Sequence, residues 1–249
     1  MEIVRKDTIT FENGNHAVVV TAPRSASPKA ILGALEIGAP RAVIMLFGGA
    51  AELDDSRKPE LVFLFADGVI PVAAELGALI IDGGTQSGAM AIMGEAVARC
   101  PGICQLLGIV PKGRIMHPEI SGTLVGSDVA PLEPNHSYFV LVESDEWGGE
   151  TGKMLELACT FNVPIVAILV NGGAITADEA LQSVRKGCQL LVIEGSGRFA
   201  DELSAAVRDG QLAKSVKVSE IVASGRVALF HANDTAQKLR RELRRMLCR

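Results

Sequence analysis

Residues 77–98 read GALIIDGGTQSGAMAIMGEAVA, and this stretch decides the fold class. It begins with an apolar, β-branched run, continues through a glycine-rich turn, and ends in a segment whose Met90, Met93 and Val97 recur at helical spacing. We therefore expect a buried strand followed by a helix. Because similar strand and helix patterns alternate along the chain, the sequence predicts an α/β fold, with a Rossmann-like, mostly parallel sheet flanked by helices on both faces.

Short apolar runs and helical patterns follow one another on both sides of this stretch. The expected strands are 16–22, 41–47, 77–84, 105–111, 137–143, 164–173 and 189–197, with 227–232 as a further candidate. The expected helices are 28–37, 59–76, 87–98, 151–161, 176–186 and 198–207, followed by a basic helix at 233–248.

The composition fits one α/β domain over residues 1–249. Hydrophobic residues make up 48% of the chain but aromatic residues only 4%, so Ala, Val, Ile and Leu must fill the interior, as in buried parallel sheets. The net charge of −5 argues against a general nucleic-acid binder, because such proteins attract phosphates with a basic field.

Targeting and metal signals are not found in the sequence. Pro71 and Glu75 interrupt the longest apolar stretch, 68–81, so it does not read as a membrane span, and no apolar leader follows the first residues. We expect a cytoplasmic protein without membrane insertion. The five cysteines fit reduced thiols, and the four histidines lack metal-like spacing, so no metal site is expected.

The C-terminal segment KLRRELRRMLCR is basic and amphipathic. An apolar stripe that includes Leu239 and Leu243 lies behind four arginines, and Asp234 with Gln237 resembles a capping box. We interpret the segment as a docked helix with a solvated basic face; docking onto an acidic partner is the alternative.

Residues 112–136 lack a clear period and are rich in glycine and proline. They predict a long connection, and loops of this length in a compact domain are usually functional or disordered. We expect a lid or rim of a binding site.

Five expected strand ends carry glycine clusters. They are FGGAAELDD (47–55), IDGGTQSGAM (81–90), SDEWGGETGKM (144–154), VNGGAIT (170–176) and IEGSGRFAD (193–201). The carboxyl ends of parallel strands share one edge of the sheet, so the five turns should meet at one crevice. Glycine lets a ligand approach the backbone, and the amino ends of the following helices favour anions. A phosphate-bearing ligand is therefore compatible with an acidic chain, although any single glycine pair also fits an ordinary tight turn.

Two familiar nucleotide motifs do not account for these turns. GGETGKM is not a phosphate loop of the GxxxxGK[ST] type, because that pattern would need glycine at Trp147 and Ser or Thr at Met154. IEGSGRFA matches GxGxxA but comes late in the chain and lacks the later acidic residue of a dehydrogenase. Arg198, at the start of the next helix, is a candidate clamp for an anionic oxygen; a salt bridge to Asp201 or Glu202 is the alternative.

Five blocks taken together resemble the SLOG superfamily, in particular its LSDAT branch, which is similar to the cytosolic N-terminal region of TRPM-type cation channels. The blocks are IDGGTQSGAMAIMGEA, LEPNHSYFVLVES, WGGETG, VPIVAILVNGG and VIEGSGRFADEL, in order between residues 41 and 203. The resemblance implies a Rossmann-like sheet that holds a nucleotide or an NAD-derived molecule, such as ADP-ribose, over its glycine-rich edge.

The resemblance also implies which residues face the ligand. The matching positions are Gly83, Gly84, Thr85 and Gly88 in the first loop, Gly148, Gly149, Thr151 and Gly152 in the second, and Gly195, Ser196, Gly197 and Arg198 in the last. The same sheet edge adds the candidates Gly48, Gly49, Glu150, Gly172 and Gly173, and the NHSYF block adds His136, for which fixing the loop structure is the alternative. Trp147 could stack on a base or simply cover the sheet edge.

A sister branch, the LOG-type phosphoribohydrolases, similar to lysine-decarboxylase-like proteins, implies an enzyme as the alternative. Their PGGxGTxxE motif is similar to GGETGKMLE, which makes Glu156 a weak catalytic candidate for cleaving a nucleotide N-glycosidic bond. However, Thr151-Gly152 reverses the motif order, and an ordinary surface helix also explains a glutamate at that position.

The sequence thus predicts binding or sensing of a nucleotide-like small molecule, with no required cofactor. A sensor would act through a separate effector protein, and a homo-oligomer is expected for a protein of this kind. A structural protein with degenerate loops is the third alternative, and it predicts no response to any nucleotide.

Overall fold

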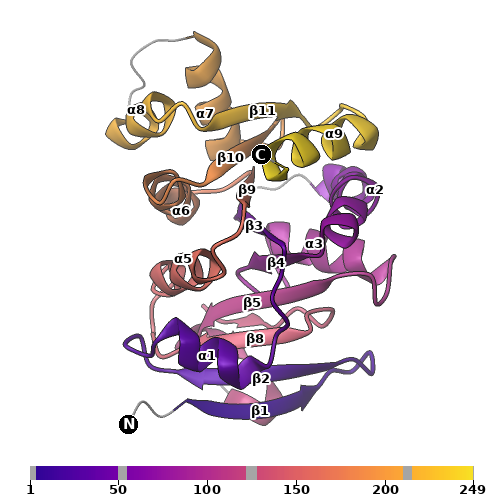
Figure 1. Cartoon of the computed structure of the whole chain (residues 1–249), viewed down its shortest axis with the longest axis vertical. Coiled ribbons are helices and arrows are strands. Elements are labelled where there is room, and N and C mark those ends of the chain that lie inside the picture. The colour runs from indigo at the N-terminus through magenta and orange to yellow at the C-terminus, as the bar shows by residue number, and fades with distance from the viewer. Residues whose placement is uncertain (1–3, 50–54, 122–127, 210–214, 249) are drawn as a thin grey trace.

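The computed structural model describes residues 4–49, 55–121, 128–209 and 215–248, with one large sheet at its centre (Figure 1). The strands of this sheet are β1 (Arg5–Thr10), β2 (His16–Ala22), β3 (Ala42–Gly48), β4 (Ala78–Asp82), β5 (Gln105–Pro111), β8 (Tyr138–Val142), β9 (Ile165–Val170), β10 (Gln189–Glu194) and β11 (Val227–His231). Their order is β1-β2-β8-β5-β4-β3-β9-β10-β11. All neighbours pair in parallel except β1 and β2. The predicted mostly parallel sheet is confirmed.

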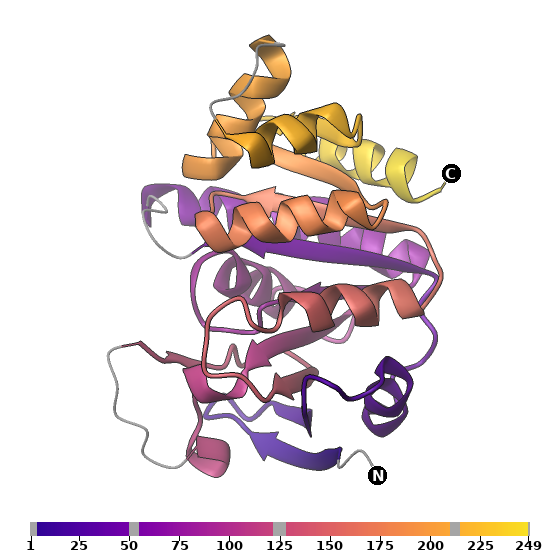
Figure 2. The same cartoon turned by 90° about the vertical axis from the view of Figure 1, so that its left-hand side faces the viewer.

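The helices lie on both faces of the sheet. They are α1 (Pro28–Leu35), α2 (Lys58–Leu76), α3 (Gly88–Ala98), α4 (Pro118–Ser121), α5 (Thr151–Thr160), α6 (Ala174–Arg185), α7 (Arg198–Asp209), α8 (Val216–Ala223) and α9 (Ala236–Leu247). Helices α1, α5, α6 and α8 cover the face that is turned toward the viewer in Figure 2, and α2, α3 and α9 cover the other.

Strand β3 shows why this sequence makes a two-faced core. Val43, Met45 and Phe47 pack with α5 and α6, whereas Ile44 and Leu46 pack with α2 and α3, and each is at most 1% exposed. A strand buried on both faces has no polar side, so it reads as a continuous apolar run.

One strand of the main sheet and one of the helices that cover it were not expected from the sequence. Strand β1 pairs antiparallel with β2 at one edge of the sheet, where only Ile9 of its six residues is buried. Helix α8 is short, and it buries Val218 and Ile221 against the core.

The segment between β5 and β8 is more structured than a plain connection. It contains a turn of 3-10 helix at Lys112–Arg114, helix α4, and two short strands, β6 (Ile115–Met116) and β7 (Ala130–Pro131), which pair in parallel. Part of the expected lid, residues 122–127, lies outside the described residues.

The C-terminal helix is docked, as predicted. Leu239, Leu243, Met246 and Leu247 of α9 are at most 4% exposed and pack on α2, where Leu239 lies so close to Gly68 that a Cβ there would be 2.6 Å from Leu239 Cδ2. An Arg244–Glu75 ion pair of 2.6 Å adds to this contact.

The predicted capping residue of α9 was wrong by one position. The N-cap is Thr235, whose side chain accepts a hydrogen bond from the Lys238 amide at 3.3 Å, while Asp234 pairs with the Lys238 ammonium group at 2.5 Å. Thr235 has the extended backbone of an N-cap residue, which lets its hydroxyl reach the third amide of the helix.

Replacing the N-cap tests this assignment. Thr235→Ala should lower the free energy of unfolding by about 1 kcal/mol, because the Lys238 amide loses its side-chain acceptor and keeps only the Thr235 carbonyl. Asp234→Ala removes only an exposed ion pair and should cost less than about 0.5 kcal/mol. Urea denaturation of the two variants measures both values. A larger loss of unfolding free energy for Asp234→Ala than for Thr235→Ala would indicate that Asp234 is the N-cap.

Candidate functional site

A cavity of about 430 Å³ lies at the carboxyl ends of β3, β4, β8 and β9, a volume typical of small-molecule sites. In the sheet, β3 lies between β4 and β9. The chain continues from β3 to β4 on one side, and only later in the sequence does it place β9 on the other side of β3. Loops that leave neighbouring strands in opposite directions open a crevice, and open α/β sheets bind ligands at such a point.

All five glycine-rich turns contribute to this cavity. Those of their residues that line it are Gly48, Gly49, Gly83, Thr85, Ser87, Met90, Trp147, Gly148, Glu150, Gly173, Ala174, Ile175, Thr176 and Arg198. Leu46 and Glu179 complete the wall from β3 and α6, and Ala130 does so from the connection after β5. The turns therefore meet at one crevice, and the connection supplies part of its rim.

The close approach of two turns requires glycine at the cavity wall. A Cβ on Gly49 would lie 3.3 Å from the Gly172 Cα, and Gly172 itself has a φ of +100°, which favours glycine. These glycines bring the ends of β3 and β9 together, so part of the wall is backbone.

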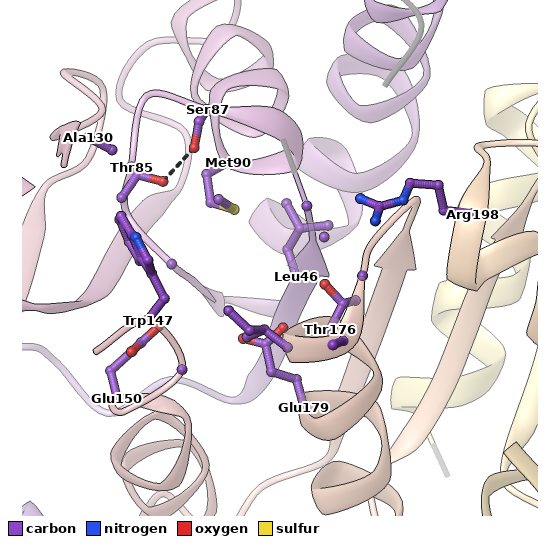
Figure 3. Close-up of a pocket in the computed structure, with 17 residues that line it drawn as sticks. Leu46, Thr85, Ser87, Met90, Ala130, Trp147, Glu150, Thr176, Glu179 and Arg198 are labelled. Carbon is purple, nitrogen blue, oxygen red and sulfur yellow. Dashed lines mark hydrogen bonds between the residues drawn. The ribbon is translucent and has the colours of Figure 1, made fainter. Parts of the chain in front are cut away.

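Arg198 extends into the cavity from the first residue of α7 (Figure 3). Its guanidinium lies over the β9 turn, since a Cβ on Gly173 would be 3.3 Å from the Arg198 Nη2 atom. Asp201, one of its expected ion-pair partners, accepts a hydrogen bond from the Gly195 amide at 2.6 Å. The cavity thus has a cation beside the amino end of α6.

Trp147 stands across the cavity from Arg198 (Figure 3). Its indole Nε1 donates a 2.9 Å hydrogen bond to the Asp128 carboxylate, which ties the ring to the connection after β5. Leu46, Met90 and Ile175 add apolar surface, so this part of the cavity suits a flat, apolar group such as a base.

Two buried acids, Glu150 and Glu179, also line the cavity (Figure 3). They are 6% and 8% exposed. Burial raises the pKa of Glu150 to about 7, against the opposing effects of backbone hydrogen bonds and of Arg24. Burial, followed by the negative charges of Glu150, Asp178 and Asp82, raises the pKa of Glu179 to about 8. At neutral pH much of this pair carries protons.

Several of the predicted residues do not line the cavity. They are Gly84, Gly88, His136, Gly149, Thr151, Gly152, Gly172, Gly195, Ser196 and Gly197. Gly84 packs on the Gly108 backbone, 2.8 Å from where its Cβ would be, and the Ser196 hydroxyl binds the Asn171 amide at 2.8 Å.

Glu156, the catalytic candidate from the motif, does not line the cavity either. Its carboxylate pairs with Lys153 Nζ at 2.6 Å and its side chain is 49% exposed. Lys153 in turn donates to the Ala26 carbonyl, so the pair helps to hold α5 against the start of α1.

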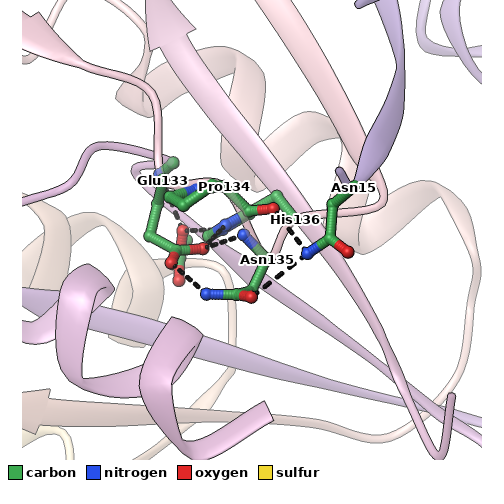
Figure 4. A network of polar contacts seen from close by, with 7 residues as sticks. Asn15, Glu133, Pro134, Asn135 and His136 are labelled. Atoms are coloured by element: carbon green, nitrogen blue, oxygen red, sulfur yellow. Dashed lines mark hydrogen bonds and ion pairs between the residues drawn. The ribbon is translucent and has the colours of Figure 1, made fainter. Parts of the chain in front are cut away.

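His136 lies at the centre of a buried network behind the cavity wall (Figure 4). Its Nε2 is 2.8 Å from an Asp82 oxygen and its Nδ1 is 2.8 Å from a Glu133 oxygen. The same Asp82 oxygen accepts from the Gly84 amide at 2.7 Å, and the Glu133 amide donates to the Gly84 carbonyl at 2.9 Å. The network therefore fixes the turn that presents Gly83 and Thr85.

Sequence reasoning missed Glu179, although a signal was present. Thr176, Glu179 and Ser183 recur at helical spacing on α6, and all three are buried. A polar stripe on a helix that must pack against a sheet indicates that its first turns reach a polar site rather than the core.

Comparison with known proteins gives one family and a set of relatives. Residues 41–240 match the family described as "SLOG in TRPM, prokaryote". Over 67% of its length the chain is 31% identical to the Transient receptor potential cation channel subfamily M member-like 2 of Nematostella vectensis. It is 28% identical to subfamily M member 2 of Rattus norvegicus over 74% of its length, and 29% identical to member 7 of Homo sapiens over 79%. The chain spans 12 to 14% of the length of these relatives.

Proposed function

Because the chain belongs to the prokaryotic SLOG family found in TRPM, we propose that its sheet-edge cavity binds and senses a nucleotide-derived small molecule, NAD-derived or ADP-ribose-like. The observation that carries this proposal is the convergence of five glycine-rich turns and one arginine on a single cavity of about 430 Å³. The match to the family described as "SLOG in TRPM, prokaryote" supports a nucleotide-related role.

The proposed ligand places its phosphate beside Arg198 and Gly173. The first amides of α6 have no partner within the helix, and the helix dipole favours an anion there. The guanidinium of Arg198 adds two parallel donors, which suits a phosphate oxygen pair. A base then lies toward Trp147, on the apolar side of the cavity.

A nucleotide N-glycosidase is the alternative function, and one observation favours it. Glu150 lines the cavity with a pKa of about 7, which is suited to a general acid at an N-glycosidic bond. This alternative rests on Glu150 rather than on Glu156, and it predicts release of free base from AMP, NAD or ADP-ribose.

The ligand proposal also leaves room for a partner protein. Within the described residues, no helix has both the length and the apolarity needed to cross a membrane. We propose that the ligand signal passes to a separate effector protein, and that homo-oligomerisation presents the sensor to it.

A thermal-shift screen of the purified protein with AMP, NAD and ADP-ribose tests the proposed ligand class. A ligand present at 100 times its Kd should stabilise the fold by about 2.7 kcal/mol, so at least one of the three should raise Tm by several degrees. No shift with any of them would refute the proposed function and favour a structural protein with degenerate loops.

Arg198→Ala should weaken binding of that ligand about 10- to 100-fold, because a charged hydrogen-bond donor to phosphate is lost. Arg208→Ala is the matched control, since Arg208 lies on the same helix but pairs with Glu194 away from the cavity. Isothermal titration calorimetry measures both Kd values. Equal affinities of the two variants for the ligand would show that Arg198 does not contribute to binding.

A further inference from the structure

The buried acids Glu150 and Glu179 are an unexpected feature of a cavity for which we propose a phosphate-bearing ligand. Glu150 comes from the start of α5 and Glu179 from α6, and both line the same wall (Figure 3). Only 6% of the Glu150 surface is exposed. In the described part of the chain, the Oε2 atom of Glu150 has no hydrogen-bond partner. A buried polar atom without a partner carries an uncompensated desolvation free energy. A ligand group that forms a hydrogen bond to this atom removes that penalty, which favours binding.

The charges that face the pair come from four elements. Arg24, in the loop between β2 and α1, acts on Glu150, while Asp82 at the end of β4 and Asp178 on α6 act on Glu179. Arg198, at the start of α7, lines the same cavity. Burial and the negative neighbours together favour the protonated form of the pair, so at neutral pH Glu179 is largely neutral and Glu150 is partly so.

A neutral carboxyl group both donates and accepts hydrogen bonds, which matches the hydroxyl groups of a sugar. A phosphate offers only acceptors and carries charge, so it is a poorer partner for this side and suits the Arg198 side. A ligand that satisfies both sides has an anionic group and neighbouring hydroxyl groups on one scaffold.

We propose that Glu150 and Glu179 hydrogen-bond the vicinal hydroxyl groups of the ligand's sugar, so that the cavity selects ribose phosphates over their deoxy counterparts. This inference rests on the proposed function, which supplies the ligand class. It adds two specificity-determining residues and an orientation, with the sugar hydroxyls toward Glu150 and Glu179 and the phosphate toward Arg198 and the amino end of α6.

The test compares AMP with 2′,3′-dideoxy-AMP, and NAD and ADP-ribose with their versions blocked at the ribose hydroxyls. Calorimetry should give a Kd at least about tenfold higher for the hydroxyl-free member of the pair whose parent binds, because the carboxyls then lose their partners. If no parent binds, the proposed function fails; if a parent binds and the two members bind equally, only the present inference is overturned.

Variants separate recognition from a merely structural role. Glu150→Gln and Glu179→Gln keep a neutral donor and acceptor and should retain the preference for the hydroxyl-bearing member. Glu150→Ala and Glu179→Ala should reduce that preference about tenfold, to near unity, with the affinity for the hydroxyl-free member unchanged. Glu220→Gln, at a partly exposed acid of α8 that pairs with Arg185, is the matched control.

The pH profile gives a second readout. Ionisation of the pair places negative charge beside the ligand phosphate, so the affinity of the wild-type protein should fall several-fold between pH 6 and pH 9. The double variant Glu150→Gln/Glu179→Gln should lose most of this dependence. Alanine variants that keep the hydroxyl preference, or a double Gln variant with the wild-type pH profile, would overturn the inference.

Discussion

His136→Gln should lower the free energy of unfolding by about 3–5 kcal/mol, the largest effect that we expect from a single substitution. His136 is 1% exposed and bridges two buried acids, with its ring nitrogens 2.8 Å from oxygens of Asp82 and Glu133. Glutamine keeps hydrogen-bonding capacity but removes the positive charge, so two buried carboxylates remain with no cation between them.

The same ion network sets a pH dependence. Burial by itself would lower the pKa of His136, but the charges and hydrogen bonds of Asp82 and Glu133 outweigh it and raise the pKa to about 9. The folded pKa thus lies above the unfolded value of about 6.5. The stabilisation is fully present below that unfolded value and is lost as the pH rises through about 9.

Urea denaturation at pH 6.5 and at pH 10 measures both effects. The difference between wild-type protein and His136→Gln should be large at pH 6.5 and should shrink at pH 10. His16→Gln, at an exposed histidine on β2, is the matched control and should change little. In the His136→Gln background, Asp82→Asn should restore part of the stability, because it removes a buried negative charge that has lost its positive partner. A loss below about 1 kcal/mol would mean that the network contributes no net stabilisation.

The network also explains how a residue that does not line the cavity can affect its shape. Asp82 and Glu133 hold both sides of Gly84, through its amide and its carbonyl, and Gly84 lies between Gly83 and Thr85 of the cavity wall. From the sequence, the resemblance made His136 a candidate ligand-facing residue, while fixing the loop structure was the favoured interpretation. The geometry puts it in the position expected for a residue that fixes the loop.

The main sheet could be predicted from the sequence because its strands are buried on both faces. Residues 105–111 were expected as a strand and form β5 with the same bounds, since an apolar run between glycine and proline signals leaves little choice. Strand β1 was missed for the opposite reason: RKDTIT is mostly polar, and its pairing partner β2, rather than its own pattern, defines it.

The place of the site was also predictable, but its lining was not. Right-handed crossovers put every strand end on one edge, so the turns had to meet there. Which residue of a turn faces the cavity depends on its backbone dihedrals. Gly83 lines the cavity while Gly84, at a φ of +62°, packs on Gly108, and no sequence pattern distinguishes them.

Electrostatics was the least predictable part. From the sequence, the glycine-rich turns and Arg198 predicted an anionic ligand. No sequence motif predicted that two acids would line the same cavity as Arg198. Glu150 was expected there only as a neighbour of glycines, and Glu179 not at all. Their effect arises from burial and from each other, because a carboxyl group responds to neighbours that only the folded chain assembles.

Glu179→Gln should stabilise the protein at alkaline pH by on the order of 2–4 kcal/mol, since one unit of pKa shift corresponds to about 1.4 kcal/mol. Burial, together with the charges of Glu150, Asp178 and Asp82, raises the pKa of Glu179 from 4.5 to about 8. A raised carboxyl pKa means that ionisation opposes folding. The penalty is absent below pH 4.5, grows as the pH rises toward 8, and is constant above it.

The measurement is the difference in unfolding free energy between Glu179→Gln and wild-type protein at pH 5 and at pH 9. Glutamine has the shape of the protonated acid, so the difference should be small at pH 5 and large at pH 9. Glu220→Gln, at a partly exposed acid of α8 that pairs with Arg185, is the matched control and should show no such increase. A difference that is equal at both pH values would mean that Glu179 is not held protonated. A buried acid that destabilises the fold near neutral pH is more typical of a functional site than of a position that contributes only to stability.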